Sequence, residues 1–220
     1  MVSYLLEAVD TTLPRWRRRK QARPQEILDA ALACFAEKGF AASRMDDIAE
    51  RAGVTKGTIY LYFENKEAVF KALVRESIGA QISQVIESIR AYEGSSRELL
   101  RNAVTMIAHF AATSDRVVLP KIIVAEAGNF PELARFYRDE IIDKGLGAMT
   151  SVITRGIARG EFREVEPDHV ARILIAPILL SIFWRTTFAQ FDTEPYDHQT
   201  FLKSHLDILL RGIAANGGAS

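Results

Sequence analysis

Cysteine is almost absent from the sequence, which holds Cys34 and no other cysteine among its 220 residues. A single cysteine excludes an intrachain disulfide and excludes zinc or iron–sulfur sites built from several thiolates. An excess of one charge is absent too, because 28 lysines and arginines balance 28 aspartates and glutamates. The chain therefore has no overall cationic field that attracts nucleic acid. The low cysteine content fits a reducing, cytoplasmic setting.

Long apolar runs are scarce as well. The first 14 residues lack the cationic leader and apolar stretch of a secretion signal. The most apolar run, from Ile173 to Trp184, is shorter than the roughly 20 residues that cross a bilayer. We expect this run to be a core helix, and we expect no association with a membrane.

Motifs for catalysis and for metal binding are also missing. The four histidines are scattered without the His-Glu spacing of zinc enzymes, and neither GxSxG nor a phosphate-binding glycine loop occurs. Asp139, Glu140 and Asp143 share one helical segment, but a solvated helix face explains them. We therefore predict no enzyme activity, no metal and no cofactor.

Helical periodicity is what the sequence does contain. Apolar residues recur three or four positions apart, for example at Leu99, Ala103 and Ile107, and glycines such as Gly94 and Gly160 mark the breaks. No segment alternates convincingly in the manner of a strand. The pattern predicts an all-α fold of about nine helices.

Residues 43–66 combine two short helices with a sharp turn between them. Ser43 and Asp46 have the spacing of a capping box at a helix start. Gly53 stands where a helix ends in a left-handed conformation, and Thr55 can cap the helix that follows. The stretch therefore predicts a helix-turn-helix, whose second helix stands out far enough to enter a major groove.

The charge around this motif is locally positive. From Arg15 to Lys66 there are 11 basic and 7 acidic residues, a net charge of +4, and the remainder holds 17 against 21, a net charge of −4. No acidic residue falls between positions 55 and 61. We expect a cationic tip, preceded by a basic arm at residues 15–20 that contacts phosphates or the minor groove. A solvated tail is the alternative for the arm.

The run GVTKGTIYLYFENKEAVF resembles the N-terminal DNA-binding domain of TetR-family transcriptional regulators. Their pattern is close to G-V-(S/T)-x-G-(T/S)-(L/I)-Y-x-(Y/H)-F-x-x-K-(E/D)-x-L. The matching residues are Gly53, Val54, Thr55, Gly57, Thr58, Ile59, Tyr60, Tyr62, Phe63, Lys66 and Glu67. Further along, the stretch VAEAGNFPELARFY is similar to part of the family.

The resemblance implies a ligand-responsive regulator, most often a repressor, that binds a palindromic DNA operator as a homodimer. Four parts are expected: a flexible basic N-terminal arm (1–20), a three-helix helix-turn-helix DNA-binding domain (21–68), a larger helical ligand-binding and dimerisation domain (69–214) and a frayed tail (215–220). Dimerisation is expected through about residues 167–214, because the last two helices are apolar on more than one face. A larger intrachain core is the alternative for that surface.

The resemblance and the basic residues together define two candidate sites. The expected contacts to double-stranded DNA are Arg17, Arg18, Arg19, Ser43, Arg44, Thr55, Lys56, Gly57, Thr58, Tyr60, Leu61, Tyr62 and Lys66. The expected lining of a pocket for a small-molecule effector is Met106, His109, Phe110, Ile123, Glu126, Phe130, Phe183 and Trp184. Core packing is the alternative for each pocket residue. The alternative function is a ligand-binding or protein-interaction module of the same fold without operator binding.

Overall fold

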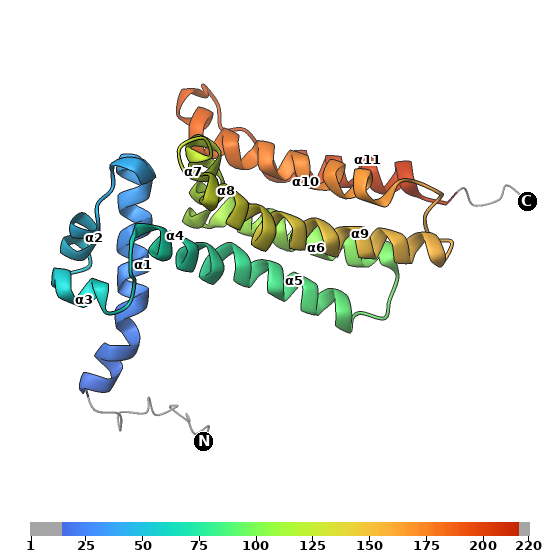
Figure 1. Cartoon of the computed structure of the whole chain (residues 1–220). Helices are drawn as coiled ribbons and strands as arrows, with labels where there is room; N and C mark the ends of the chain where they lie inside the picture. The colour runs from blue at the N-terminus through green and yellow to red at the C-terminus, as the bar shows by residue number, and fades with distance from the viewer. Residues whose placement is uncertain (1–14, 216–220) are drawn as a thin grey trace, which may run out of the picture.

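The structure is a computed structural model that describes residues 15–215, and Figure 1 traces the whole chain. Within the described residues there is no strand, and the helices join into nine continuous segments. The predicted all-α fold and the predicted number of helices are therefore confirmed. The elements are α1 (Arg15–Ala42), α2 (Met45–Arg51), α3 (Lys56–Tyr60), α4 (Lys66–Val74), α5 (Ala80–Ala91), α6 (Ser96–Thr113), α7 (Val118–Glu126), α8 (Pro131–Tyr137), α9 (Asp143–Ala158), α10 (Pro167–Phe183) and α11 (His198–Ile213).

Short tighter or wider helical turns link several of these elements end to end. A π-helical turn η1 (Arg75–Gly79) joins α4 to α5, and a second, η3 (Arg138–Ile142), joins α8 to α9. Turn η2 (Asp115–Val117) leads into α7. Turns η4 (Trp184–Phe188) and η5 (Ala189–Phe191) extend α10.

The two ends of the chain differ from the sequence-based expectation where they are described. Helix α1 begins at Arg15, so residues 15–20, expected in a flexible arm, are helical, while residues 1–14 lie outside the described residues. In the expected frayed tail, the amide of Ala215 donates to the carbonyl oxygen of Glu161 at 3.1 Å. Residues 216–220 lie outside the described residues.

Helices α1, α2 and α3 form a separate lobe at the left of Figure 1, and α5, α6, α9, α10 and α11 lie side by side as a bundle. Helix α4 leaves the lobe and continues through η1 into α5, so one helix serves both parts. Helices α7 and α8 lie between the lobe and the end of the bundle nearest to it.

Two clusters of buried apolar side chains stabilise the fold. The first is centred on Phe35, Phe40 and Phe70, whose ring centroids lie 5.3 to 5.7 Å apart. This cluster also contains Leu119 and Leu133 from α7 and α8, so it crosses the predicted domain boundary at residue 68. The second cluster fills the bundle with side chains of α5, α6, α9, α10 and α11.

The apolar run lies within one continuous helix formed by α10 and its extensions η4 and η5. The helix from Pro167 to Phe191 has 25 residues, and by length and composition alone it could cross a membrane. Val170, Leu174 and Ile178, however, are buried in the second cluster, as expected for a core helix of a globular protein.

Candidate functional site

The turn between α2 and α3 has the conformation that the sequence predicts. Gly53 has a φ of +64°, in the left-handed region that side chains with a Cβ rarely adopt. Its amide donates to the carbonyl oxygen of Glu50, and the amide of Val54 donates to that of Ala49, both at 3.0 Å. These bonds use carbonyl groups at the end of α2, and the glycine lets the chain reverse at once.

Helix α3 is short, capped at its start and anchored by one buried residue. The Thr55 hydroxyl accepts a hydrogen bond from the amide of Thr58 at 3.2 Å, as the sequence predicts. Ile59 is fully buried, whereas Tyr60 is 46% exposed and Leu61 is 82% exposed. The helix therefore presents an aromatic and an aliphatic side chain to solvent at its end, which suits contact with base edges and thymine methyl groups.

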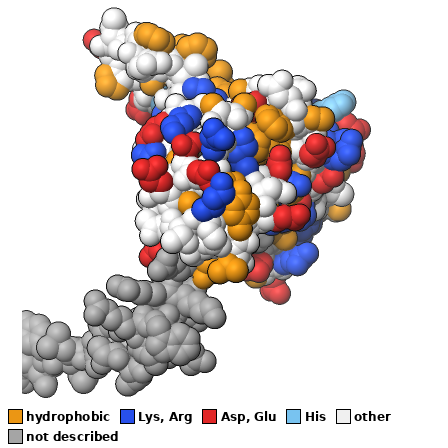
Figure 2. Space-filling view, turned by 60° about the vertical axis from the view of Figure 1, so that its left-hand side comes forward, with side chains coloured by type: hydrophobic (Ala, Val, Ile, Leu, Met, Phe, Trp, Pro, Cys, Tyr) orange, Lys and Arg blue, Asp and Glu red, His pale blue; other side chains and the backbone are white. Residues whose placement is uncertain are grey.

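Lys56, the basic residue of α3, is paired with an acidic residue ten positions earlier in the chain. The Lys56 ammonium lies 3.0 Å from the carboxylate of Asp46, in the first turn of α2. The hydrogen bond to Asp46 raises the pKa of Lys56. Figure 2 turns this side of the molecule forward and shows basic and acidic side chains interspersed. The tip is therefore not free of acids, although no acid occurs between positions 55 and 61.

Ser43 does not have the predicted role at the DNA surface. Its side chain is buried, with 2% exposure, and its hydroxyl donates to the carbonyl oxygens of Gly39 at 2.7 Å and Cys34 at 3.1 Å. The capping arrangement is shifted by one residue, because Asp47 accepts from the amide of Arg44 at 3.0 Å. Ser43 therefore stabilises the end of α1 from inside the protein.

The side chain of Arg44, another expected DNA contact, is described by the structure, whereas the side chains of the three arginines in α1 are not. Arg44 is exposed and is the N-cap residue of α2. Arg17, Arg18 and Arg19 lie in the first turns of α1, where the structure describes the backbone only. Their contact with DNA stays a prediction.

Lys66 is engaged within the protein rather than extended from its surface. Its ammonium donates to the carbonyl oxygens of Phe40 at 2.6 Å and Ala41 at 3.0 Å, and it lies 4.5 Å from the centre of the Phe40 ring. Burial lowers the pKa of Lys66. These contacts tie the start of α4 to the end of α1. The expected contact of Lys66 with DNA stays a prediction.

A second contact at the end of α1 comes from the far part of the chain. The Glu126 carboxylate, at the end of α7, accepts from the amide of Ala41 at 3.0 Å. The Phe130 ring meets the Phe40 ring edge-on at 4.9 Å. Asn129 donates to the same carboxylate at 3.3 Å. We call Glu126, Asn129 and Phe130 the α7–α8 corner; it fixes the lobe to the bundle.

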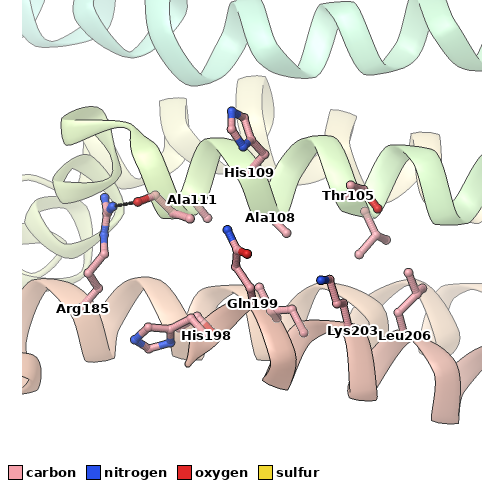
Figure 3. Close-up of a pocket in the computed structure, with 13 residues that line it drawn as sticks. Thr105, Ala108, His109, Ala111, Arg185, His198, Gln199, Lys203 and Leu206 are labelled. Carbon is pink, nitrogen blue, oxygen red and sulfur yellow. Dashed lines mark hydrogen bonds between the residues drawn. The ribbon is translucent and has the colours of Figure 1, made fainter. Parts of the chain in front are cut away.

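A cavity of about 250 Å³ opens between α6, α10 with its extension η4, and α11 (Figure 3). Gln199 and Lys203 project from α11 on the side that faces α6, and Arg185 bonds to a carbonyl group of α6. The residues that line it are Val104, Thr105, Ala108, His109, Ala111, Ala112, Ser181, Arg185, His198, Gln199, Leu202, Lys203 and Leu206.

Of the eight residues predicted to line a pocket, only His109 lines this cavity. Met106 and Phe110 pack against the second cluster, Ile123 belongs to the first, and Phe130 packs against the first. The others have different contacts: Glu126 lies in the α7–α8 corner, Phe183 is partly buried at the end of α10, and the Trp184 indole donates to Asp192 at 2.8 Å.

Ser181, Arg185, His198 and Lys203 line the cavity but were not predicted to do so. Two features of the sequence point to this lining. Ser181 interrupts the most apolar run of the chain, and His198, Leu202 and Leu206 recur at helical spacing on one face of α11.

The last two long helices expose large apolar side chains. Ile173 and Leu180 of α10 are 53% and 55% exposed, and Ile208 of α11 is 71% exposed. These residues lie on neighbouring helices at the outer edge of the bundle. Large apolar side chains exposed on adjacent helices are typical of contacts with a partner.

Comparison with known proteins agrees with these features. The family model described as "Bacterial regulatory proteins, tetR family" matches residues 27–73, and "Tetracyclin repressor-like, C-terminal domain" matches residues 91–197. The "Fatty acid metabolism regulator protein" of Bacillus subtilis (strain 168) is 32% identical over 196 residues, which cover 88% of this chain and 98% of that protein.

A second relative and a solved structure cover the chain to a similar extent. The "HTH-type transcriptional repressor KstR2" of Mycolicibacterium smegmatis is 25% identical over 90% of this chain and 93% of its own. The crystal structure of the transcriptional regulator FadR from Bacillus subtilis in complex with stearoyl-CoA has a TM-score of 0.71 and 28% identity, covering 86% of this chain and 98% of that one. With these matches over both parts of the molecule, the chain belongs to the TetR family of bacterial transcriptional regulators.

Proposed function

We propose that this regulator is a ligand-responsive repressor that binds a palindromic DNA operator as a homodimer in the bacterial cytoplasm. A small molecule in the C-terminal part releases it from DNA. The observation that carries the proposal is the turn at Gly53, which presents α3 with Tyr60 and Leu61 exposed beyond a buried Ile59. The names of the relatives, a fatty acid metabolism regulator and a repressor, support the same function.

Contact with DNA is assigned to α3 and the start of α2. Thr55 and Thr58 form the polar start of α3, and Tyr60 and Leu61 extend beyond its end. Lys56 and Arg44 supply positive charge for the phosphates, which dominate affinity and its dependence on salt.

Dimerisation is assigned to α10 and α11. Ile173, Leu180 and Ile208 leave apolar surface exposed that a second copy of the chain can cover. A twofold axis through this surface repeats α3 at a second position, as a palindromic duplex requires.

Coupling between ligand and DNA is assigned to the α7–α8 corner. Glu126 holds the amide of Ala41, and Phe130 packs on Phe40, so any shift of α7 moves the end of α1 and with it α2. A ligand changes DNA affinity only if it binds one arrangement of these helices better than the other.

Selection from random duplex DNA tests the proposal directly. The purified full-length protein should enrich duplexes with two inverted half-sites about one helical turn apart. Leu61→Ala should relax the preference at one position of each half-site, because it removes an apolar contact to a base. Failure to enrich any sequence at moderate salt would favour the alternative module without operator binding.

A further inference from the structure

The cavity between α6, α10 and α11 has an apolar floor built from small side chains. Three alanines on one face of α6 take up little volume, and two leucines of α11 close the opposite side. The apolar lining is Val104, Ala108, Ala111, Ala112, Leu202 and Leu206. Its volume of about 250 Å³ lies just below the roughly 300–1,000 Å³ of pockets for drug-sized ligands, so it suits a compact guest.

Two buried polar atoms in the cavity wall lack a hydrogen-bond partner among the described residues. They are the hydroxyl oxygen of Ser181, a residue that is only 6% exposed, and Nδ1 of His198. A buried donor or acceptor without a partner is costly, so such groups mark places where a bound molecule supplies the missing bond. Both residues line the same cavity.

The ionisable side chains that line the cavity are all basic. Arg185 and Lys203 line it, together with His109 and His198, and no carboxylate does. Two guanidinium nitrogens of Arg185 donate to the carbonyl oxygens of Ala112 and Ser114, and these bonds fix the side chain. Neither Arg185 nor Lys203 forms a salt bridge within the described residues. The nearby carboxylates of Asp192 and Asp197 lie outside the lining and are bonded to Trp184 and Thr200.

We propose that this cavity binds a compact amphipathic carboxylate, with its aliphatic part on the alanine and leucine floor and its carboxylate bonded to Ser181 and His198. Arg185 and Lys203 balance its charge. The inference rests on the proposed function, which requires an effector site in the C-terminal part, and it names the class of that effector. Because a carboxylate only accepts hydrogen bonds, it matches the Ser181 hydroxyl and a protonated Nδ1 of the imidazole.

Calorimetric titration of the full-length protein with four eight-carbon probes tests the proposal. Octanoate should bind, octanol should bind at least about tenfold more weakly because its head group is neutral, and octylammonium should not bind measurably. Octanoyl-CoA should also bind more weakly than octanoate, because its thioester lacks the anionic oxygen at the end of the chain. Equal binding of octanol and octanoate, or binding of octanoyl-CoA alone, would overturn the proposal.

Variants separate the head-group contact from folding. Lys203→Gln, at an exposed position, should weaken octanoate several-fold and leave the weak octanol binding unchanged. Ser181→Ala should weaken octanoate about tenfold with an unchanged melting temperature or a higher one, since it removes a buried hydroxyl. Lys144→Gln, on the exposed face of α9, is the matched control and should change neither. An octanoate affinity that is the same in Lys203→Gln, Ser181→Ala and Lys144→Gln would also contradict the proposal.

Failure of this inference and failure of the proposed function give different results. A protein that selects a palindromic duplex but does not bind octanoate contradicts only the ligand class. A protein that binds octanoate without any change in operator affinity contradicts the ligand response and leaves the cavity assignment intact.

Discussion

Asp46 faces the ammonium of Lys56 across the start of α2, although the two residues are ten positions apart. An exposed ion pair of this kind is worth little to stability, but its carboxylate stands close to where DNA phosphates are expected. Approach of DNA must compete with this carboxylate for Lys56. The acidic partner therefore limits affinity for DNA in general and does not select a sequence.

Asp46→Asn should raise operator affinity about two- to fivefold at low salt, since it frees Lys56 and removes a negative charge near the phosphates. The gain should shrink as salt increases. A gel-shift series over salt concentration measures it, with Glu87→Gln on the exposed face of α5 as the control. Weaker binding by Asp46→Asn would indicate that Asp46 orients Lys56 productively.

Lys66 should act on stability rather than on DNA affinity. Lys66→Ala removes two hydrogen bonds to carbonyl oxygens and a contact with the Phe40 ring, so the free energy of unfolding should fall by about 1–2 kcal/mol. The slope of operator affinity against salt should stay unchanged. A slope reduced by about one unit would instead identify Lys66 as a phosphate contact.

Among single residues, the sequence identifies those whose role is local. The Gly53 turn and the Thr55 cap depend on neighbours a few positions away, and both were predictable from spacing. The Ser43 hydroxyl also bonds locally, to a carbonyl oxygen four positions away, but its spacing predicts a helix cap instead. The carbonyl partner of Lys66 is 26 positions away, so it depends on how α1 packs on α4, and the sequence pattern does not specify that.

At the scale of the element, the helix-turn-helix depends on one left-handed residue. Gly53→Ala should destabilise the protein by about 1–2 kcal/mol, because the positive φ strains a residue that has a Cβ. A steric clash does not contribute, since a Cβ there meets no atom within 4 Å. Gly147→Ala is the matched comparison in the exposed middle of α9, where a Cβ also meets nothing within 4 Å and φ is helical. This second change should stabilise by about 0.5–1 kcal/mol. Urea denaturation measures both, and equal effects would contradict the assignment.

Helices α1 and α2 are also joined by ion pairs that respond to acid. The ammonium of Lys38 and the amide of Arg44 lower the pKa of Asp47, and Arg51 lowers the pKa of Glu37. The pKa values of these carboxylates in the folded protein lie below their ordinary values of 3.8 and 4.5. The ion pairs therefore stabilise the folded protein fully at pH values above 3.8 and 4.5, and this stabilisation is lost as the pH falls through the folded-state pKa values.

Asp47→Asn should therefore be less stable than the native chain at pH 7, and the difference should shrink as the pH drops below 3.8. Denaturant titrations at several pH values give this difference directly. A difference that is the same at every pH would show that Asp47 acts only through packing.

Elements were more predictable than the cavity. Periodicity and helix-ending glycines follow from local sequence, so the number of helices and the turn were within reach. The cavity is formed where α6, α10 and α11 meet, and its lining depends on the rotation of each helix about its axis. Phe110 and His109 are neighbours in α6, yet only His109 faces the cavity.

At the scale of the whole molecule, the exposed apolar face of α10 predicts association. Leu180→Glu should convert a dimer into a monomer at micromolar concentration, because it introduces a charge into the contact. Operator affinity should then fall at least about 100-fold, since two linked half-site contacts become independent. Sedimentation velocity and gel shifts measure the two effects. Ile142→Glu, at another exposed apolar position, should change neither.

The first buried cluster has a consequence for how such regulators can be recombined. Phe40 and Phe70 belong to the same buried cluster as Leu119 and Leu133. The helix-turn-helix lobe therefore shares its core with α7 and α8, which come much later in the sequence. A chimaera that joins residues 1–74 to the C-terminal part of another regulator will expose the rings of Phe40 and Phe70 unless it also includes α7 and α8. Transfer of DNA specificity from one such protein to another therefore requires that the core residues of α1, α4, α7 and α8 be transferred together.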